Sequence, residues 1–211
     1  KSFCAGADLK GDSGQAPDSE GRGPVGTTYR GQEHIVDLMM AVHECDKPVI
    51  AAIHGAAVGG GLALSLASDL RVADTTAYFG SVFINVGLTS CDIGTSYFLP
   101  RLVGSGHAMD MMITGRHVAA EEADRMGLLN RLVPEGTHLE VAKEFAAQIA
   151  KNNEYGVWLT KRGLWSNIDA PSIRHAVELE NRQQVLGIFT GNMKEATVAF
   201  GERREPDWGP M

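Results

Sequence analysis

Apolar residues in the first half of the chain fall into two kinds of run. Residues 49–53 (Val-Ile-Ala-Ala-Ile) form a short, continuous apolar run, and residues 70–73 (Leu-Arg-Val-Ala) are apolar apart from Arg71; both are typical of buried strands. Between them, residues 60–67 are small and apolar over a length that favours a helix, and residues 32–45 have apolar side chains at helical spacing. Because a strand–helix–strand order implies a parallel pair joined by a right-handed crossover, the pattern predicts an α/β fold.

The second half of the chain favours helices. Residues 77–79 and 84–86 are short strand-like pieces, and residues 128–133 are extended after a short helix at 119–126 that ends at Gly127. Further helices are expected at residues 95–103, 106–113, 138–151, 172–189 and 194–202. Apolar stripes along the last helices are typical of a protein core or of a subunit interface.

These elements predict a core at residues 1–136 and a C-terminal helical region at residues 137–211. Residues 11–26 are rich in Gly, Ser, Pro and charged side chains, which predicts a loop. That loop is either a cover for an active site or a surface insertion. Because the chain opens with Lys1 inside a strand-like segment, we expect further N-terminal strands to be missing before it.

Composition narrows the classes of partner. The 211 residues are 44% hydrophobic and 21% charged with a net charge of −7, which is typical of a globular protein and disfavours nucleic acid as a partner. No apolar run is long enough to span a membrane, and no signal peptide is visible. The three cysteines lack metal-ligand spacing, so we expect a reducing, cytoplasmic environment and no metal site.

Two glycine-containing loops carry the clearest chemical signal. Residues 58–63 (Val-Gly-Gly-Gly-Leu-Ala) join a predicted strand to a predicted helix, and residues 3–10 (Phe-Cys-Ala-Gly-Ala-Asp-Leu-Lys) form a second loop. Glycine permits positive φ and close approach to the backbone, and the first N–H groups of a helix favour negative charge. Since each loop can offer one backbone N–H to a single oxygen, the pair predicts an oxyanion hole.

The same segments resemble the crotonase (enoyl-CoA hydratase/isomerase) superfamily. The resemblance continues through the Phe79-Gly80 pair and residues 100–104, 114–116 and 127–134, so it spans nearly the whole chain. It implies a crotonase-like spiral of ββα units followed by a C-terminal helical trimerisation region. It also implies a homotrimer or hexamer that acts on a coenzyme A thioester without a separate cofactor.

The resemblance assigns roles to individual residues. It implies that the backbone N–H groups of Ala7 and Gly60 form the oxyanion hole. Lys10 stands where members of the family reach toward the CoA nucleotide, although an ordinary surface lysine is the alternative. Phe200 and Arg203 take the C-terminal positions that contact CoA across a subunit boundary. The residues expected to contact substrate or CoA are Ala5, Asp8, Lys10, Phe83, Phe200 and Arg203.

The acid–base positions depart from the hydratase pattern. The resemblance places Ala63 and Phe83 at the two positions where hydratases of this family carry glutamates that bind the attacking water. Neither of these side chains can move a proton. The segment around Asp92 resembles dienoyl-CoA isomerases and an aryl-CoA dehalogenase, in which an aspartate acts. Asp92 is therefore our candidate for proton transfer or nucleophilic attack, and the alternative is a helix N-cap.

Four functions remain open from the sequence. The favoured one is an enoyl-CoA hydratase that stabilises a thioester enolate, because hydration is the commonest reaction of the family. The second is an enoyl- or dienoyl-CoA isomerase in which Asp92 moves a proton. The third is an acyl-CoA-binding protein without catalysis, and the fourth is hydrolysis or dehalogenation with Asp92 as the nucleophile.

Overall fold

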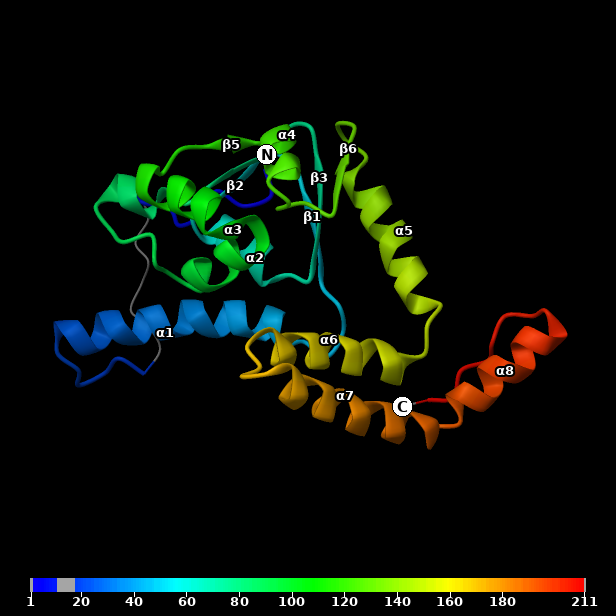
Figure 1. The fold of residues 1–211 in the computed structure, drawn as a ribbon. Helices are drawn as coiled ribbons and strands as arrows, with labels where there is room; N and C mark the ends of the chain where they lie inside the picture. The colour runs from blue at the N-terminus through cyan, green and yellow to red at the C-terminus, as the bar shows by residue number, and fades with distance from the viewer. Residues whose placement is uncertain (1, 11–17, 211) are drawn as a thin grey trace. The chain divides into compact units, whose positions relative to one another are not determined.

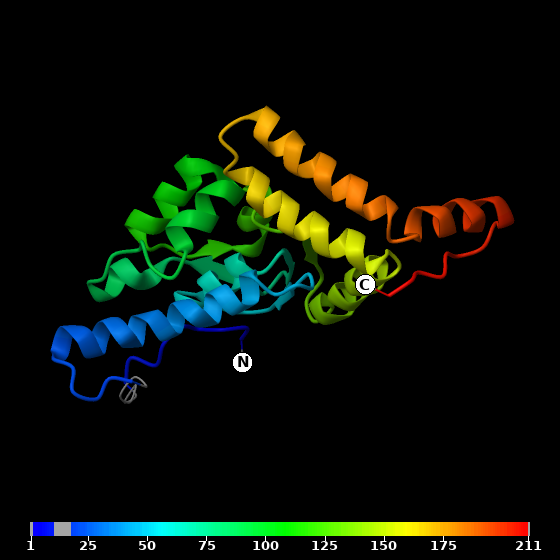
Figure 2. The same ribbon diagram turned by 90° about the horizontal axis from the view of Figure 1, so that it is seen from below.

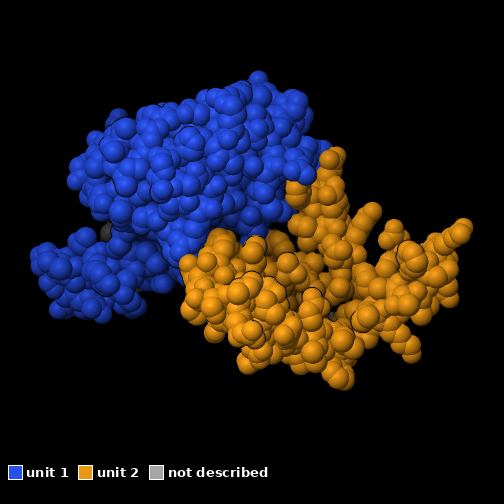
Figure 3. Space-filling model, in the orientation of Figure 1, with its two compact units in different colours: residues 1–45, 49–143 blue, residues 46–48, 144–211 orange. Residues whose placement is uncertain are grey.

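The computed structural model describes residues 2–10 and 18–210, and it contains two compact units. The first consists of Lys1–Cys45 and Val49–Lys143, and the second of Asp46–Pro48 and Glu144–Met211 (Figure 3). The expected division between residues 136 and 137 stays a prediction. No helix in the described ranges is long and apolar enough to cross a membrane.

Two three-stranded sheets form the centre of the first unit. One sheet is parallel and has the order β1 (Ile50–Ile53), β3 (Leu70–Asp74), β6 (Arg131–Val133). In the other sheet, β2 (Ala56–Val58) pairs in parallel with β4 (Tyr78–Gly80), which pairs antiparallel with β5 (Val118–Ala119). The predicted strands at 49–53, 70–73 and 77–79 are therefore confirmed to within one residue at each end.

The chain passes from one sheet to the other in each turn of a spiral. β1 and β2 lie in different sheets, and helix α2 (Gly60–Ala67) returns the chain to β3, which lies beside β1 (Figure 1). β4 then follows β3 and lies beside β2. This repeat of two strands and a helix is the expected ββα spiral, and it buries the side chains of Ile53, Leu62, Leu66, Val72 and Phe79.

The remaining helices of the first unit differ in detail from the predictions. α1 (Pro24–His43) starts earlier than residue 32, because Pro24 suits the first turn of a helix. Residues 24–26 of the predicted loop therefore belong to α1, and residues 11–17 lie outside the described residues. α3 (Thr95–Thr114) bends at Gly104, whose φ is +78°, as the two predicted helices require. α4 (Ala120–Arg125) ends before Gly127, as expected.

The strand predicted at residues 84–86 is wrong. These residues belong to η1 (Val82–Val86), a 3₁₀ helix. Gly87, with φ +82°, donates its N–H to the Ile84 carbonyl, and the Leu88 N–H bonds to the Phe83 carbonyl. The segment thus closes a turn on itself, and because Ile84 and Val86 are exposed, their apolar character does not indicate a buried strand.

The second unit is helical. α5 (His138–Ala150) begins in the first unit, and α6 (Glu154–Ile168), α7 (Ile173–Ile188) and α8 (Asn192–Glu202) follow it. α6 and α7 lie side by side (Figures 1 and 2). The sequence did not predict α6, because the side it buries carries Lys161 and Gly163 rather than an apolar stripe. A Cβ at Gly163 would lie 2.6 Å from Gln183 Oε1, so the glycine allows α7 to approach closely.

Candidate active site

The two glycine-containing loops lie side by side in the first unit. The Phe3 and Cys4 N–H groups donate to the carbonyls of His54 (2.8 Å) and Ala56 (2.9 Å), and the Val58 N–H donates to the Cys4 carbonyl (3.2 Å). These bonds place Cys4 beside Ala57 in a parallel β-bridge. The first loop is therefore fixed along β2, and the residues after Cys4 lie against the beginning of α2.

The contact between the loops requires glycine at two positions. A Cβ at Gly61 would lie 2.1 Å from the Cys4 carbonyl oxygen, which no side chain can accommodate. Gly6 has a φ of +84°, and a Cβ there would lie 3.1 Å from the Val58 carbonyl oxygen and 3.5 Å from the Gly60 nitrogen. The first loop therefore packs directly on the first turn of α2.

This packing leaves two backbone donors for a ligand. Gly60 is the first residue of α2, so its N–H has no acceptor within the helix. In the ranges that the structure describes, neither the Ala7 N–H nor the Gly60 N–H donates a hydrogen bond, whereas the neighbouring Gly59 N–H donates to the Gly80 carbonyl at 2.9 Å. Both donors belong to the contacting loops, and the Gly60 N–H also carries the positive end of the helix dipole.

The positions of the two missing glutamates are apolar. Ala63 lies one turn into α2 and is fully buried, with its N–H bonded to the Gly59 carbonyl at 3.1 Å. Phe83 on η1 is half-buried, and its ring lies 4.0 Å from where a Cβ of Gly59 would stand. Neither position therefore carries a polar side chain, and Phe83 lies next to Gly59.

Asp92 accepts a hydrogen bond from a different helix. Its carboxylate oxygen Oδ1 accepts from Gln32 Nε2 of α1. Helix α3 begins at Thr95 after Gly94, and no side chain caps it, so the helix N-cap interpretation of Asp92 is wrong. The Thr95 N–H instead bonds to the backbone carbonyl of Asp92 at 2.8 Å.

Ile93 connects the Asp92 segment to the glycines. A Cβ at Gly60 would lie 3.9 Å from Ile93 Cδ1, and the Ile93 side chain is buried. Its φ is +37°, which is an outlier for a β-branched residue and costs about 1–3 kcal/mol. Asp92 therefore precedes a residue that lies close to the first turn of α2 and that has a disfavoured backbone conformation.

An apolar pocket of about 340 Å³ lies between α1 and the start of α3. This volume lies within the range of about 300–1,000 Å³ that is usual for small-molecule sites. Ile93 and Gly94, the two residues after Asp92, belong to its wall, so the pocket begins at the candidate site. The other side chains that line it are Val36, Met39, Met40, His43, Tyr97 and Phe98.

The other residues predicted to bind substrate or CoA lie in two places. Ala5, Asp8 and Lys10 are exposed residues of the first loop, and the Asp8 carboxylate accepts the Lys10 N–H at 2.9 Å. Phe200, which is 87% exposed, and Arg203, which ends α8 with φ +55°, belong to the second unit. The structure thus brings the first-loop residues together with Gly60, Phe83 and Asp92 in one unit.

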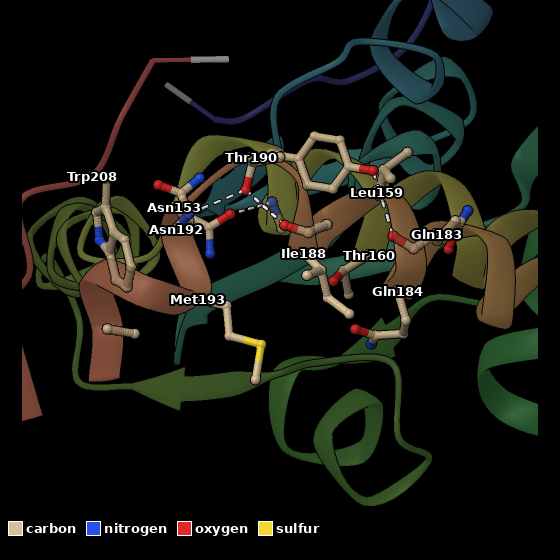
Figure 4. Close-up of a pocket in the computed structure, with 14 residues that line it drawn as sticks. Asn153, Leu159, Thr160, Gln183, Gln184, Ile188, Thr190, Asn192, Met193 and Trp208 are labelled. Carbon is tan, nitrogen blue, oxygen red and sulfur yellow. Dashed lines mark hydrogen bonds between the residues drawn. The ribbon is translucent and has the colours of Figure 1, made fainter. Parts of the chain in front are cut away.

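The second unit has a pocket of its own (Figure 4), with a volume of about 280 Å³. Two of its asparagines bond to the backbone: Asn153 Oδ1 accepts the Gly156 N–H in the first turn of α6 at 2.6 Å, and Asn192 Oδ1 accepts the N–H of Gly209 in the C-terminal tail at 3.1 Å. Trp208, also in its wall, donates to the Lys151 carbonyl at 2.7 Å. Neither Phe200 nor Arg203 lines this pocket.

A buried carboxylate, that of Asp74, lies at the end of β3. Asp74 accepts the N–H groups of Thr76 (2.9 Å) and Gly136 (3.0 Å), and His138 Nδ1 lies 2.9 Å from its Oδ2. Burial alone would raise the pKa of Asp74, but the hydrogen bonds from Thr76 and Gly136, with His138, outweigh it and hold that pKa below its ordinary value. The His138 ring stacks on His54 at the end of β1, with 4.8 Å between centroids.

Sequence reasoning missed Gln32 and the pocket. The signal for both is the spacing along α1: Gln32, Val36, Met39 or Met40, and His43 recur every three or four residues, so they share one face of the helix. The sequence could not show which element lies opposite that face. No three His, Cys, Asp or Glu side chains come together as a metal site in the part of the chain that the structure describes.

Comparison with known proteins identifies the relatives of this chain. Residues 1–210 match the family model described as enoyl-CoA hydratase/isomerase. The chain is 42% identical over 207 residues to the probable enoyl-CoA hydratase EchA12 of Mycobacterium tuberculosis, which covers 98% of this chain and 72% of the relative. It is 36% identical over 208 residues to the (E)-benzylidenesuccinyl-CoA hydratase of Thauera aromatica, covering 98% and 76% of the two chains.

Solved structures agree with this result. The fold matches a probable enoyl-CoA hydratase/isomerase from Mycobacterium abscessus with a TM-score of 0.88 and 40% identity, over 92% of this chain and 74% of the other. It matches an enoyl-CoA hydratase from Bacillus anthracis with a TM-score of 0.86 and 34% identity, over 98% and 76% of the two chains. The resemblance found in the sequence is therefore confirmed.

Proposed function

The chain belongs to the enoyl-CoA hydratase/isomerase family, and we propose that it hydrates the double bond of a 2-enoyl-CoA through an enolate of the thioester. The observation that carries this proposal is the seating of the first loop on α2, where a Cβ at Gly61 would overlap the Cys4 carbonyl. That contact leaves the N–H groups of Ala7 and Gly60 available to one carbonyl oxygen. Coenzyme A enters as part of the substrate, and the proposal needs no further cofactor.

The backbone donors stabilise the charge that forms on the thioester oxygen. When water adds to C3 of the enoyl group, negative charge moves to this oxygen, and the Ala7 and Gly60 N–H groups bond to it more strongly than to the neutral carbonyl. One such donor contributes about 2.7–4 kcal/mol to the transition state. Because the donors are fixed by packing, they need no reorganisation during the reaction.

Asp92 takes the place of the two missing glutamates. Its carboxylate accepts a proton from the water that attacks C3, and the same proton then goes to C2 of the enolate, so the sum is addition of one water molecule. Such a positioned acid–base group contributes typically about 10²–10⁴-fold to the rate. Support comes from Ile93, the next residue, whose Cδ1 lies 3.9 Å from where a Cβ of Gly60 would stand, so the Asp92 segment lies close to one of the backbone donors.

Isomerisation of the double bond is the second candidate. The apolar residues Ala63 and Phe83 favour it, because neither can hold a water molecule near the double bond. In that reaction Asp92 removes a proton from one carbon and returns it to another, and no water is consumed. The apolar pocket between α1 and α3 would hold the acyl group in both reactions, and it favours an acyl group without charge.

A matched pair of variants at Gly60 tests the oxyanion hole. Proline is tolerated at the first position of a helix, so Gly60→Pro removes the N–H and retains the start of α2. Gly60→Ala retains the N–H, and its Cβ would make ordinary contacts at 3.8 and 3.9 Å. We expect Gly60→Pro to have a kcat about 10²–10³-fold below that of Gly60→Ala with crotonyl-CoA. Equal activity of the two variants would contradict the oxyanion hole.

Asp92→Asn tests the acid–base group. We expect loss of the crotonyl-CoA absorbance to slow by about 10²-fold or more, because the amide cannot carry the proton. Asp124→Asn, on the exposed surface of α4, is the matched control and keeps its activity. Turnover by Asp92→Asn at the rate of the control would contradict the role of Asp92. Acyl-CoA binding without turnover in the unaltered protein would favour the non-catalytic alternative.

We also propose that the chain assembles as a homotrimer or hexamer through its C-terminal helices. α7 buries none of its residues within the chain, although Ile173, Val185 and Leu186 are large and apolar. Apolar surface of this extent is typical of an interface between subunits. Sedimentation equilibrium tests the assembly, and a monomer at micromolar concentration would contradict it.

A further inference from the structure

Gln32 connects helix α1 to the candidate acid–base residue. Its Nε2 donates to Oδ1 of Asp92, sixty residues further along the chain. One turn later on the same face of α1, Val36 begins the wall of the apolar pocket, which Ile93 and Gly94 continue on the other side. The Gln32–Asp92 pair therefore lies where the walls of the pocket begin.

We propose that Gln32 is a positioning residue that orients the Asp92 carboxylate for proton transfer, an inference that rests on the proposed function of Asp92. The hydrogen bond occupies Oδ1. The second oxygen, Oδ2, accepts no hydrogen bond from any of the residues described, so it is free to take the proton of the reaction.

The position of Asp92 explains why such a residue is needed. The Asp92 side chain is half-exposed, it does not cap α3, and the next residue has a strained φ of +37°. An aspartate in this setting can rotate away from the substrate, and misplacement of a catalytic group by about 1 Å can cost about 10²-fold in rate. A hydrogen bond from a helix fixes the rotamer, because α1 is a rigid support.

The chemistry of glutamine suits the task. A lysine or arginine in its place would form an ion pair with Asp92, which favours the charged carboxylate and so weakens it as a proton acceptor. The amide of Gln32 is neutral and donates a weaker bond. It can therefore orient the carboxylate with less effect on its basicity.

A double-mutant cycle tests this role. The four proteins are the unaltered chain, Gln32→Leu, Asp92→Asn and the double variant, each assayed for kcat and KM with crotonyl-CoA. We expect Gln32→Leu to lower kcat by about tenfold with KM changed less than about threefold, since only the orientation of Asp92 is lost. In the Asp92→Asn background the same substitution changes kcat by less than about twofold.

Control measurements separate orientation from stability. Gln148→Leu, at an exposed position on α5, is the matched control for the change of side chain and keeps kcat unchanged. Gln32→Leu should keep the urea midpoint of the unaltered chain, because exposed substitutions change stability by about 0.5 kcal/mol or less. A fall in kcat that follows a fall in the urea midpoint would contradict the positioning role.

The outcomes distinguish failure of this inference from failure of the proposed function. If Asp92→Asn loses activity but Gln32→Leu does not, Gln32 has no positioning role and the function of Asp92 stands. If Gln32→Leu lowers kcat equally with and without Asp92, Gln32 acts on another group and the inference is overturned. If Asp92→Asn keeps full activity, the proposed role of Asp92 fails, and the role of Gln32 fails with it.

Discussion

The backbone half of the candidate site, residues 4–7 and 59–61, is held by close packing and backbone hydrogen bonds. In the side-chain half, by contrast, the Asp92 carboxylate accepts a single hydrogen bond from the described residues, and Gln32 donates it. In the first half, a single added methyl group would overlap a backbone carbonyl. In the second half, the carboxylate is half-exposed and depends on a residue of another helix. The donors are therefore part of the fold, while the acid–base group can change position without disturbing it.

The substitution Gly61→Ala should have the largest effect on the backbone half. The new Cβ would lie 2.1 Å from the Cys4 carbonyl oxygen, so either the first loop or α2 must move. Overpacking of this kind costs about 1–3 kcal/mol and more where the backbone must shift, and we expect at least about 3 kcal/mol. Urea unfolding followed by circular dichroism measures the change in the free energy of unfolding.

The control for Gly61→Ala is Gly106→Ala in the second half of α3. No atom lies within 4 Å of a Cβ at Gly106, and its φ is not positive. Alanine is the better helix former by about 1 kcal/mol, so this variant should be as stable as the unaltered chain or slightly more stable. All three tryptophans (Trp158, Trp165 and Trp208) lie in the second unit, so their fluorescence reports separately whether that unit is affected.

Ala63→Glu, which restores a glutamate of the hydratase pattern, should be the next most damaging change. Ala63 is fully buried on α2, and a carboxylate there would lack both space and partners. We expect a loss of about 3 kcal/mol and no gain in hydration. Phe83→Glu, at a half-buried position, should cost less than half of this. Equal stability of the two variants in urea would show that the backbone half has room for the missing side chain.

The substitution Asp74→Asn tests a buried carboxylate that accepts several hydrogen bonds, in contrast to the half-exposed carboxylate of Asp92. Because hydrogen bonds hold the pKa of Asp74 below its ordinary value of about 3.9, the charged form stabilises the folded state above that pH. This stability is lost as the pH falls through the folded pKa. We expect Asp74→Asn to lose about 2 kcal/mol at pH 7. Urea unfolding at pH 7 and pH 3 should show a smaller difference from the unaltered chain at the lower pH.

An equal difference at both pH values would mean that the charge of Asp74 does not stabilise the fold. Asp124→Asn is the control, because its side chain is exposed and its substitution should leave stability unchanged at either pH. Asp92→Asn should resemble this control in stability, although it differs in activity. The comparison thus separates a carboxylate that supports the fold from one that we propose for chemistry.

Local requirements made much of the fold predictable. The apolar side chains at residues 49–53 and 70–73 are short-range signals of a strand, and Gly59, with φ +55°, marks the turn into α2 at its own position. The break between the helices predicted at 95–103 and 106–113 falls at Gly104, which has a positive φ.

Features that depend on distant segments were not predictable. α6 was missed because it buries Lys161, whose Nζ bonds to the Lys47 carbonyl at 3.2 Å, and this partner lies far away in the sequence. Arg71 is similar, since burial lowers its pKa to about 10 and its guanidinium donates to the Ser68 and Leu128 carbonyls. Gln32 and Asp92 meet only because α1 packs in the same unit as α3.

Gly87→Ala should have the smallest effect, and it separates backbone conformation from packing. Gly87 has φ +82°, but no atom lies within 4 Å of a Cβ there, so the cost is that of the left-handed conformation alone, about 1 kcal/mol. Gly87→Asn should cost less, because asparagine visits this conformation more readily. Gly61, by contrast, does not have a positive φ, so the cost of Gly61→Ala comes from close contact alone. If Gly87→Ala proved as damaging in urea as Gly61→Ala, the close contact would add no more than a left-handed conformation does, and the backbone half would not be held by packing.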